Sequence, residues 1–517
     1  HLDDPLKKYY PDFYWKTRFG KDEVDKITFR HLLTHYAGFP HFTPLKSSDD
    51  KFLTFNEYIE KINDCWQLYP VGTRFSYSNA GIDIVAFILQ KISGKGYAEY
   101  IRDEVYQPLG MMRSTVEPAK ALKMDNHARG FSGNKQTSIS NTLMPCLGAG
   151  AQFSSVNDMA KFLQMHFNNG YVGSERFLKE ELLAEMYTIP FAYKYELTKI
   201  GLGIGISKND YGGELVLRFF GDGPGYINMH HIFPKLGIGW LLQINQNQAV
   251  FPFLFKLADK VGPALVKFKL GEIPKSITIT DEVILPKEIK LDINKAKRLE
   301  GKYISRMTNI ELENKNGILV FTMQGEEHQL KAHSGSEFST EKFPLISFDY
   351  DETGRPKTIK LVSVQGRITV LDYDSGPLDT QGPDKDEWKD YCFIYRSDYS
   401  GISYYSTSSI DHGYLHLVTN IGDKIYRLNE YKKGIFFTAD GQCVQLSKDK
   451  IKLPISDWIK DDISIEKIKL LLKNDSKNIQ VKLESLKELI FIYEATNQKN
   501  NLEQLKKIID ETYPGDL

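Results

Sequence analysis

The residues whose types and spacing could do chemistry most directly form the short sequence Tyr77-Ser78-Asn79. It follows the turn-forming stretch Pro70-Val71-Gly72 and precedes an apolar helical pattern that ends at Gly94. A phenol and an amide at a loop-to-helix junction can face a cleft instead of a core. The same residues would also serve as a plain helix cap without a chemical role. The apolar residues of the predicted helix fall on one broad face: Ile84, Val85, Phe87, Ile88, Leu89 and Ile92.

Composition excludes several classes of protein. The 517 residues include 66 Lys and Arg against 67 Asp and Glu, a balance that gives no reason to expect nucleic acid or an anionic membrane as a partner. The four cysteines lie far apart and form neither a disulfide framework nor a zinc-ligand spacing. No stretch of the sequence is apolar enough to predict a membrane span.

The element that positions Tyr77-Ser78-Asn79 belongs to a first segment, residues 1–271, which mixes amphipathic helices with apolar strands. This mixture predicts an α+β domain with an antiparallel sheet. Near its end the apolar runs 201–206 and 237–244 are predicted strands. Residues 272–295 carry two prolines among charged residues and are predicted to be an extended linker.

The second half of the chain has a different texture. Residues 296–376 and 386–455 show short alternating runs between turns, typical of small antiparallel barrels, and a faint internal repeat favours two similar β-modules. Residues 456–517 are predicted to be a short helical tail that serves packing or dimerisation.

Six short sequences occur in order within the first 250 residues: Leu2-Asp3-Asp4-Pro5, Ile27-Thr28 with Leu32-Leu33-Thr34-His35, Tyr77-Ser78-Asn79, Pro108-Leu109-Gly110-Met111, Gly148-Ala149-Gly150 and Pro224-Gly225-Tyr226. In this order they resemble the serine β-lactamase and penicillin-binding-protein superfamily, most closely its class C-like branch of esterases, D-aminopeptidases and S12-type peptidases. The resemblance covers about half of the chain and implies a β-lactamase/transpeptidase-like fold for residues 1–271. The two C-terminal modules resemble the lipocalin-like barrels of D-aminopeptidases.

The resemblance implies acyl transfer, in which a serine attacks an amide or ester carbonyl and water releases the acyl group. Tyr77 matches the family's general base, and Asn79 matches the amide that orients a lysine and the substrate. Counting back from Pro224 places the third motif at Phe219-Phe220-Gly221. The backbone N–H of Asp222, directly after Gly221, would then be an oxyanion-hole donor.

One departure from the family pattern lies in this third motif. Phe219 stands where the family has Lys or His, which puts recognition of a penicillin-like carboxylate in doubt. Arg218 is adjacent but is predicted to point to the opposite face of the strand. A shorter loop would instead align Asp222 with the basic position, and an acid there is no better.

The other departure is the S-x-x-K nucleophile. Strings of this form begin at Ser48, Ser132, Ser339, Ser447 and Ser464, a number expected by chance in a Lys-rich chain. In the family the motif opens the helix just before the sequence matched here by Leu2-Asp3-Asp4-Pro5. We therefore expect the nucleophile to lie upstream of His1 and the given chain to be inactive.

Two pairs of histidines raise the question of a metal. His31 and His35 lie four apart on a predicted helix, but no acidic residue lies between them, and the resemblance makes them structural. His230 and His231 are neighbours on a predicted strand and face opposite ways, so they cannot chelate one ion together. The sequence predicts neither a metal nor a cofactor.

The predicted function is that of a serine hydrolase that acts through an acyl-enzyme on an amide, peptide or ester. The alternative is a non-catalytic ligand-binding relic of the same fold. The expected partner is a small molecule or short peptide, and the oligomeric state is not predicted. By resemblance, the expected location is periplasmic or extracellular.

Overall fold

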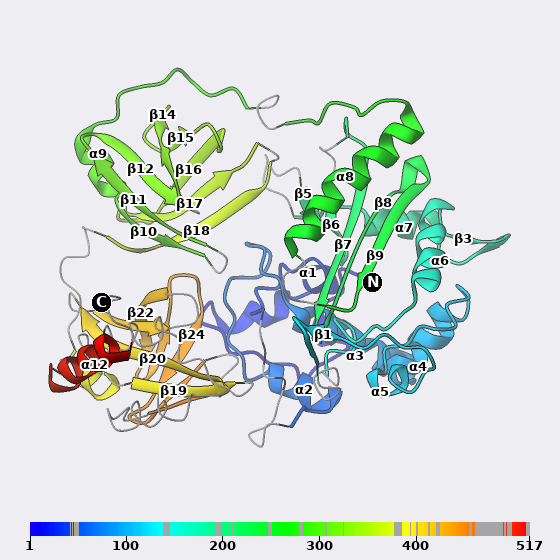
Figure 1. Cartoon of the computed structure of the whole chain (residues 1–517), viewed down its shortest axis with the longest axis horizontal. Coiled ribbons are helices and arrows are strands. Elements are labelled where there is room, and N and C mark those ends of the chain that lie inside the picture. The colour runs from blue at the N-terminus through cyan, green and yellow to red at the C-terminus, as the bar shows by residue number, and fades with distance from the viewer. Residues whose placement is uncertain are drawn as a thin grey trace. The chain divides into compact units, whose positions relative to one another are not determined.

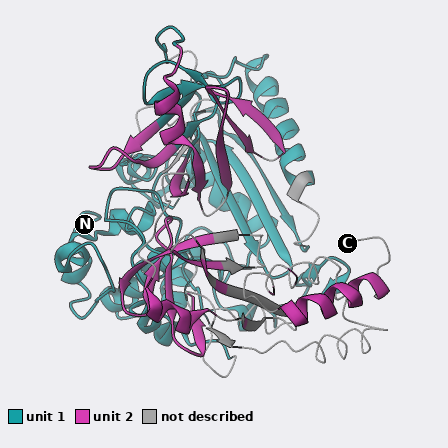
Figure 2. Ribbon diagram, turned by 90° about the vertical axis from the view of Figure 1, so that its left-hand side faces the viewer, with its two compact units in different colours: residues 1–289, 331–347, 360–369 teal, residues 290–330, 348–359, 370–517 magenta. Residues whose placement is uncertain are grey.

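The structure of the chain is a computed structural model. It describes residues 1–41, 43, 45, 51–137, 145–191, 198–203, 205–207, 211–246, 251–278, 283–305, 308–323, 325–364, 366–376, 385–392, 394–399, 402–411, 414–419, 424–453, 457–460, 490, 493 and 499–512. The chain divides into two compact units, shown in different colours in Figure 2: residues 1–289, 331–347 and 360–369, and residues 290–330, 348–359 and 370–517.

Short helices dominate the first part of unit 1 (Figure 1). The α-helices are α1 (Phe29–Leu33), α2 (Phe55–Ile62), α3 (Asn79–Ser93), α4 (Tyr97–Ile101), α5 (Pro118–Ala121), α6 (Val156–Phe167), α7 (Glu180–Met186) and α8 (Phe251–Leu270). Shorter helical turns are η1 (Leu6–Lys8), η2 (Lys21–Lys26), η3 (Arg102–Tyr106) and η5 (Pro234–Leu236). Two hairpins join them, β1 (Phe131–Ser132) with β2 (Lys135–Gln136), and β3 (Tyr171–Val172) with β4 (Glu175–Arg176).

Helix α3 has the predicted bounds. It begins at Asn79 and ends at Ser93, and the C-cap residue Gly94 has a φ of 70°, the left-handed conformation that glycine adopts at helix ends. Ile84 and Ile88 are buried in the core as predicted, whereas Ile92 is 59% exposed, contrary to prediction. Ile92 lies in the last turn, beyond the part of the helix that packs in the hydrophobic core.

A five-stranded antiparallel sheet completes unit 1, in the order β5-β6-β7-β8-β9. Its strands are β5 (Thr198–Ile200), β6 (Gly205–Ser207), β7 (Val216–Gly223), β8 (Tyr226–Phe233) and β9 (Ile238–Ile244). The long helix α8 packs on one face of the sheet, and α6 packs on the other (Figure 1). Side chains that alternate along each strand therefore face α8 and α6 in turn.

The two predicted strands of this sheet have different outcomes. The run 237–244 forms β9, as predicted. The run 201–206 is not one strand: residues 201–203 form the turn between β5 and β6, and Gly203 has a φ of 71°. Gly201 and Gly203 belong to this turn, whereas Gly205 is the first residue of β6.

The C-terminal half contains two antiparallel sheets, so the predicted fold class is confirmed. A nine-stranded sheet has the order β13-β12-β11-β10-β18-β17-β16-β15-β14, and the eight strands β19 to β26 form a closed barrel. The first sheet comprises β10 (Gly301–Ile304), β11 (Asn309–Lys315), β12 (Ile318–Met323), β13 (Glu326–Gln329), β14 (Lys331–Ala332), β15 (Glu337–Ser339), β16 (Leu345–Tyr350), β17 (Pro356–Val362) and β18 (Ile368–Ser375). The barrel comprises β19 (Ile394–Tyr399), β20 (Ile402–Asp411), β21 (Tyr414–Thr419), β22 (Lys424–Lys432), β23 (Ile435–Phe437), β24 (Cys443–Leu446), β25 (Lys450–Lys452) and β26 (Asp457–Lys460).

Side chains fill the barrel. Trp388, from the short helix η7 (Asp386–Tyr391), packs in one core cluster with Tyr395 and Phe436. Each of these three side chains is at most 1% exposed. The described side chains inside this eight-stranded barrel therefore form a packed core.

The segments around the two sheets differ in detail from the predicted ranges. In the range predicted as linker, Ile289 forms a β-bridge with Ala332, and helix α9 (Ile293–Leu299) has already begun. Strand β26 closes the barrel within the range predicted as tail. Helix α12 (Lys499–Thr512) is part of the predicted helical tail, most of which lies outside the described residues. Among the described helices, none is long and apolar enough to cross a membrane.

Candidate active site

The structure presents Tyr77 at the surface, directly before α3. Its side chain is 40% exposed, and its ring lies 4.5 Å from the ring of His35 and 5.1 Å from that of His41. Asn79, half-buried, is the first residue of α3. Ser78 occupies the N-cap position, but its side chain makes no capping hydrogen bond. The side-chain cap that the sequence left open for this stretch is therefore not formed by Ser78.

His31 and His35 do not share a helix, contrary to prediction, because α1 ends at Leu33 and His35 adopts a left-handed φ of 64°. His31 has a structural role at the start of α1, where its Nδ1 accepts the backbone N–H of Thr28 at 3.2 Å. His35 Nδ1 accepts the backbone N–H of Ser78 at 3.1 Å. Burial lowers the pKa of His35 to about 4, so this imidazole is neutral at ordinary pH.

Asp83, one helical turn after Asn79, is a buried carboxyl that the sequence reasoning missed. Its Oδ1 accepts the backbone N–H groups of Gly148 at 2.8 Å and Ala149 at 3.1 Å. Burial raises the pKa of Asp83 to about 7, although these hydrogen bonds act in the opposite direction. An acidic residue inside an apolar helical face was the feature of the sequence that could have revealed it.

The first glycine of Gly148-Ala149-Gly150 is required by the close approach of this loop to α3. A Cβ atom on Gly148 would lie 2.7 Å from Cβ of Ala86 and 3.2 Å from the carbonyl oxygen of Ile82. Only glycine allows the loop to approach α3 closely enough for Asp83 to bind its backbone. The loop is therefore fixed to the helix that begins at Asn79.

The predicted third motif lies on β7, in a hairpin with β8. Phe219 stacks on His230, with ring centroids 4.3 Å apart, and Gly221 is the register partner of Asn228. Pro224 and Gly225 form the hairpin turn, and Gly225 has a φ of 85°, which favours glycine. Phe219 and Gly221 therefore share the face of the sheet that α6 covers.

Asp222 and Arg218 face the other side of β7. Arg218 pairs in register with His231, whose ring lies 4.7 Å from that of Trp240. Because neighbouring residues of a strand face opposite sides, the Arg218 side chain cannot take the place of a basic side chain at position 219, as predicted. Burial, with a smaller effect of Arg367, lowers the pKa of Arg218 to about 10. Asp222 lies three residues beyond Phe219, on this same side, and partial burial raises the pKa of its carboxyl. The alternative alignment would therefore place the basic position on the face of β7 opposite to Phe219.

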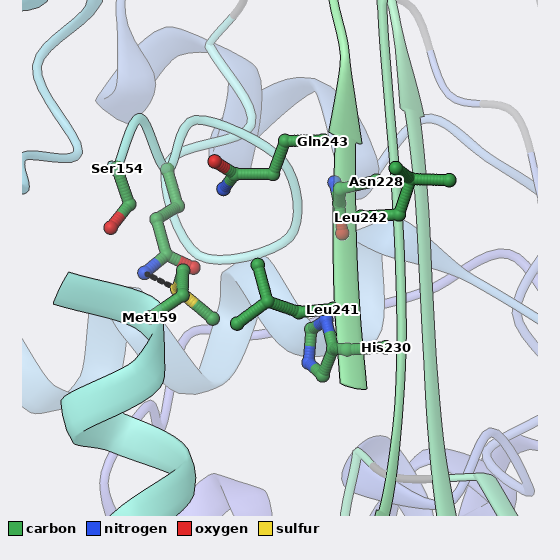
Figure 3. A pocket seen from close by; sticks show the side chains of 8 residues that line it. Ser154, Met159, Asn228, His230, Leu241, Leu242 and Gln243 are labelled. Carbon is green, nitrogen blue, oxygen red and sulfur yellow. Dashed lines mark hydrogen bonds between the residues drawn. The ribbon is translucent and has the colours of Figure 1, made fainter. Parts of the chain in front are cut away.

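A small pocket adjoins this hairpin on its α6 side (Figure 3). Its volume of about 60 Å³ has room for a few water molecules. In Figure 3, Met159 and Ser154 lie on one side of it, and Gln243, Asn228 and His230 lie on the other. None of these side chains carries a fixed charge, and burial lowers the pKa of His230 to about 4. The sequence raises His230 only as a candidate metal ligand and predicts none of the lining residues as part of a site: Gln152, Ser154, Met159, Asn228, His230, Leu241, Leu242 and Gln243.

The predicted site residues therefore form two pairs and one outlier. Tyr77 and Asn79 lie together at the start of α3, and Phe219 and Gly221 lie together on β7, whereas Asp222 faces away from Phe219. None of the five lines the pocket. The loop from Gly148 to Ser154 links the pairs, because it is bound to α3 at one end and lines the pocket beside β8 at the other.

The S-x-x-K serines within the described residues do not begin helices. Ser132 ends β1, Ser339 ends β15, and Ser447 lies in a turn where its N–H donates to the carbonyl of Lys450. Ser48 and Ser464 lie outside the described residues. The family's nucleophile opens a helix, so the three described serines do not have its structural context.

Comparison with known proteins identifies the family. Residues 1–259, half of the chain, match the Beta-lactamase family model. The chain belongs to the β-lactamase family. This β-lactamase-family chain is 23% identical over 261 residues to the D-alanyl-D-alanine-carboxypeptidase/endopeptidase AmpH of Escherichia coli (strain K12), covering 48% of this chain and 64% of AmpH. It is 28% identical over 268 residues to the β-lactamase-like protein 4 of Dictyostelium discoideum, covering 46% of this chain and 44% of that protein.

Solved structures that this chain resembles include an octameric penicillin-binding protein homologue from Pyrococcus abyssi. It is 20% identical, with 81% of each chain covered and a TM-score of 0.43. The D-amino acid amidase from Ochrobactrum anthropi is 23% identical, with 52% of this chain and 77% of that chain covered and a TM-score of 0.41.

Proposed function

We propose that the natural protein is a serine hydrolase that forms an acyl-enzyme on an amide, peptide or ester. The observation that carries the proposal is the half-exposed phenol of Tyr77, held directly before α3 with Asn79 one residue into the helix, in a β-lactamase-family chain. In this role Tyr77 takes the proton of the nucleophile, and Asn79 orients the substrate.

The third motif would complete the site with backbone groups. A backbone N–H at Asp222 would stabilise the oxyanion, an interaction that does not depend on where the Asp222 side chain points. Phe219 offers no cation, and the adjoining pocket has an uncharged lining with a neutral His230. These features favour a substrate without a carboxylate beside the scissile bond, such as a neutral amide or ester.

The position of the nucleophilic serine can be tested directly. We propose that residues 1–517 alone form no acyl-enzyme, because no described S-x-x-K serine begins a helix. The test reads the gene upstream of the His1 codon for S-x-x-K shortly before Leu2, and treats both the given chain and the upstream-extended chain with a fluorophosphonate probe. We expect an adduct on the upstream serine alone, formed at least tenfold more slowly after Tyr77→Phe.

Other results would change the assignment. An adduct on a serine within residues 1–517 would overturn the proposal about the nucleophile. An upstream sequence without S-x-x-K, or an extended chain that does not label, would reject the hydrolase in favour of a non-catalytic binding protein. That alternative is favoured by one observation, the aromatic Phe219 at the position of the family's cation.

The domain boundaries, the location and the partner of the protein are proposed as follows. We propose domains near 1–271, 296–376 and 386–455, with a linker that ends before α9 and a tail that begins after β26, and an exported location. A short peptide or small molecule is the proposed partner. Limited proteolysis that leaves fragments ending near 271 and 376 would support these boundaries.

A further inference from the structure

His35 holds the backbone on both sides of Tyr77. Its carbonyl oxygen accepts the N–H of Ser76 at 2.8 Å, and its ring Nδ1 accepts the N–H of Ser78 at 3.1 Å. The residue between these two donors is Tyr77, whose ring lies 4.5 Å from the imidazole. One residue therefore fixes the backbone before and after the proposed base.

The conformation of His35 is specialised for this contact. Its φ of 64° lies in the left-handed region, which only a few per cent of residues other than glycine adopt. The side chain is only 6% exposed, 43 residues distant in sequence from the N–H that it binds. A left-handed backbone at a buried ring is retained when the surroundings require it, and here it aims Nδ1 at Ser78.

The segment after His35 extends the same support. The carbonyl of Tyr36 accepts the N–H of Gly72 at 2.8 Å, and the Ser76 hydroxyl donates to the carbonyl of Phe39 at 2.6 Å. The stretch 35–39 therefore acts as a template for the stretch 72–78. Within it, His35 supplies the contact by a side chain, which makes its role accessible to substitution.

The hydrogen bond also specifies the state of the imidazole. Nδ1 can accept the Ser78 N–H only when it carries no proton, so the proton of the neutral ring is on Nε2. A protonated ring would place two N–H donors against each other at Ser78 and lose this contact.

We propose that His35 is the positioning residue of Tyr77, acting through its Nδ1 acceptor and its left-handed backbone. The catalytic meaning of this role rests on the proposed function of Tyr77, but the positioning itself is measured without turnover. Packing alone would predict that an apolar side chain of similar size replaces His35 well. Positioning through Nδ1 predicts that an acceptor matters more than apolar bulk.

Three substitutions separate these possibilities. His35→Asn keeps an acceptor bonded to Cγ and tolerates the left-handed backbone, His35→Gly keeps only the backbone, and His35→Leu keeps only the bulk. The readouts are deuterium uptake at the Ser78 amide, resolved by fragmentation mass spectrometry, and the side-chain NMR signals of ¹³C-labelled Tyr77. The ¹⁵N shifts of His35 in the natural chain report its tautomer.

We expect protection of the Ser78 amide to persist in His35→Asn and to fall by roughly tenfold in His35→Gly and His35→Leu, the size expected for one hydrogen bond. The Tyr77 signals should move in the same two variants. His166→Asn, a substitution of another buried histidine, is the matched control and should leave both readouts unchanged. Unchanged Ser78 protection in His35→Gly, better retention in His35→Leu than in His35→Asn, or a proton on Nδ1 would each overturn the proposal.

These readouts remain informative if the hydrolase assignment fails. A chain that forms no acyl-enzyme but shows the expected order of variants keeps the positioning role and loses the catalytic one. In an extended chain that does label, the slowing of acylation should follow the same order, with His35→Asn closest to the natural protein.

Discussion

Asp83 and Gly148 are joined directly, by a 2.8 Å hydrogen bond from the Gly148 backbone to Oδ1 of Asp83, although they lie 65 positions apart. Asp83 is one turn beyond Asn79 in α3, and Gly148 is four residues before Gln152 at the pocket. This bond therefore connects the helix that presents the Tyr-x-Asn sequence with the loop that lines the pocket. The acceptor of this hydrogen bond is a buried carboxyl, and its ionised form is costly to bury.

Asp83→Asn should make the protein less sensitive to high pH. The pKa of Asp83 is raised to about 7 by burial, whereas in the unfolded chain it is about 3.9, so this one carboxyl destabilises the folded state progressively as pH rises from about 4 to 7. The neighbouring Cys146 and Tyr97 do not titrate in this range, because burial raises the pKa of each to about 12. Relative to the natural protein, Asp83→Asn should gain roughly 3 kcal/mol in unfolding free energy between pH 5 and pH 8.

Urea unfolding at the two pH values measures this difference. Asp83→Leu is the control, because it removes the charge and also the acceptor for Gly148 and Ala149, and it should be destabilised at both pH values. A stability difference between Asp83→Asn and the natural protein that does not change with pH would contradict the prediction.

Gly148→Ala should weaken the same junction from the other side. The added methyl group would meet Cβ of Ala86 at 2.7 Å and Oδ1 of Asp83 at 3.3 Å, so the loop has to move away from α3. We expect a loss of about 1–3 kcal/mol in thermal unfolding experiments. Gly223→Ala is the matched control, because a Cβ there meets nothing within 4 Å. Equal stability of the two variants would show that the close approach of loop and helix carries no energetic weight.

Local patterns explain how much of the fold and of the site was predictable. Asn79 to Gly94 has a period and an end residue that specify a helix, and Pro224-Gly225 between apolar runs specifies a hairpin. The same local rules failed where one residue type fits two structures. Glycines in the run 201–206 are as compatible with a turn as with a strand, and Ile92 has the correct period but lies past the packed part of its helix.

The residues that sequence reasoning missed are those defined by distant partners. Asp83 looks like a lone acid in a helix until Gly148 is placed against it, and His35 looks like a helical residue until Ser78 is placed beside its ring. The pocket combines Gln152, Asn228 and Gln243, from a loop and two strands. No period or motif in a single segment encodes such a set, because tertiary packing decides which of many polar side chains meet.

Acid should unfold unit 1 through its buried histidines. Burial lowers the pKa of His35, His166 and His230 to about 4 and that of His231 to about 3. An unfolded histidine has a pKa of about 6.5, so on acidification below that value the unfolded chain binds protons that the folded chain does not. Stability should therefore fall steeply from about pH 6.5 to pH 4.

Thermal unfolding at half-unit pH steps measures this fall. The slope of unfolding free energy against pH reports the number of protons taken up on unfolding. His166→Gln should lower this number by about one, because His166 is fully buried in the natural protein. His127→Gln is the control, since His127 is exposed and its replacement should leave the steepness unchanged. A natural protein equally stable at pH 7 and pH 4.5 would contradict the burial of these four rings.

Trp388 should be the side chain on which the closed barrel depends most. It is 1% exposed, lies 6.0 Å from the ring of Phe436, and donates from Nε1 to Glu430 at 3.3 Å. Trp388→Ala would leave a cavity and remove one of the two donors to Glu430 Oε2, the other being Lys385, and we expect a loss of about 3–5 kcal/mol in urea unfolding followed by circular dichroism. Tyr431→Ala, at a 42% exposed position of β22, should cost less than about 1 kcal/mol. If both variants were equally stable, the interior of the barrel would not be packed around Trp388, and the space would be open to a ligand.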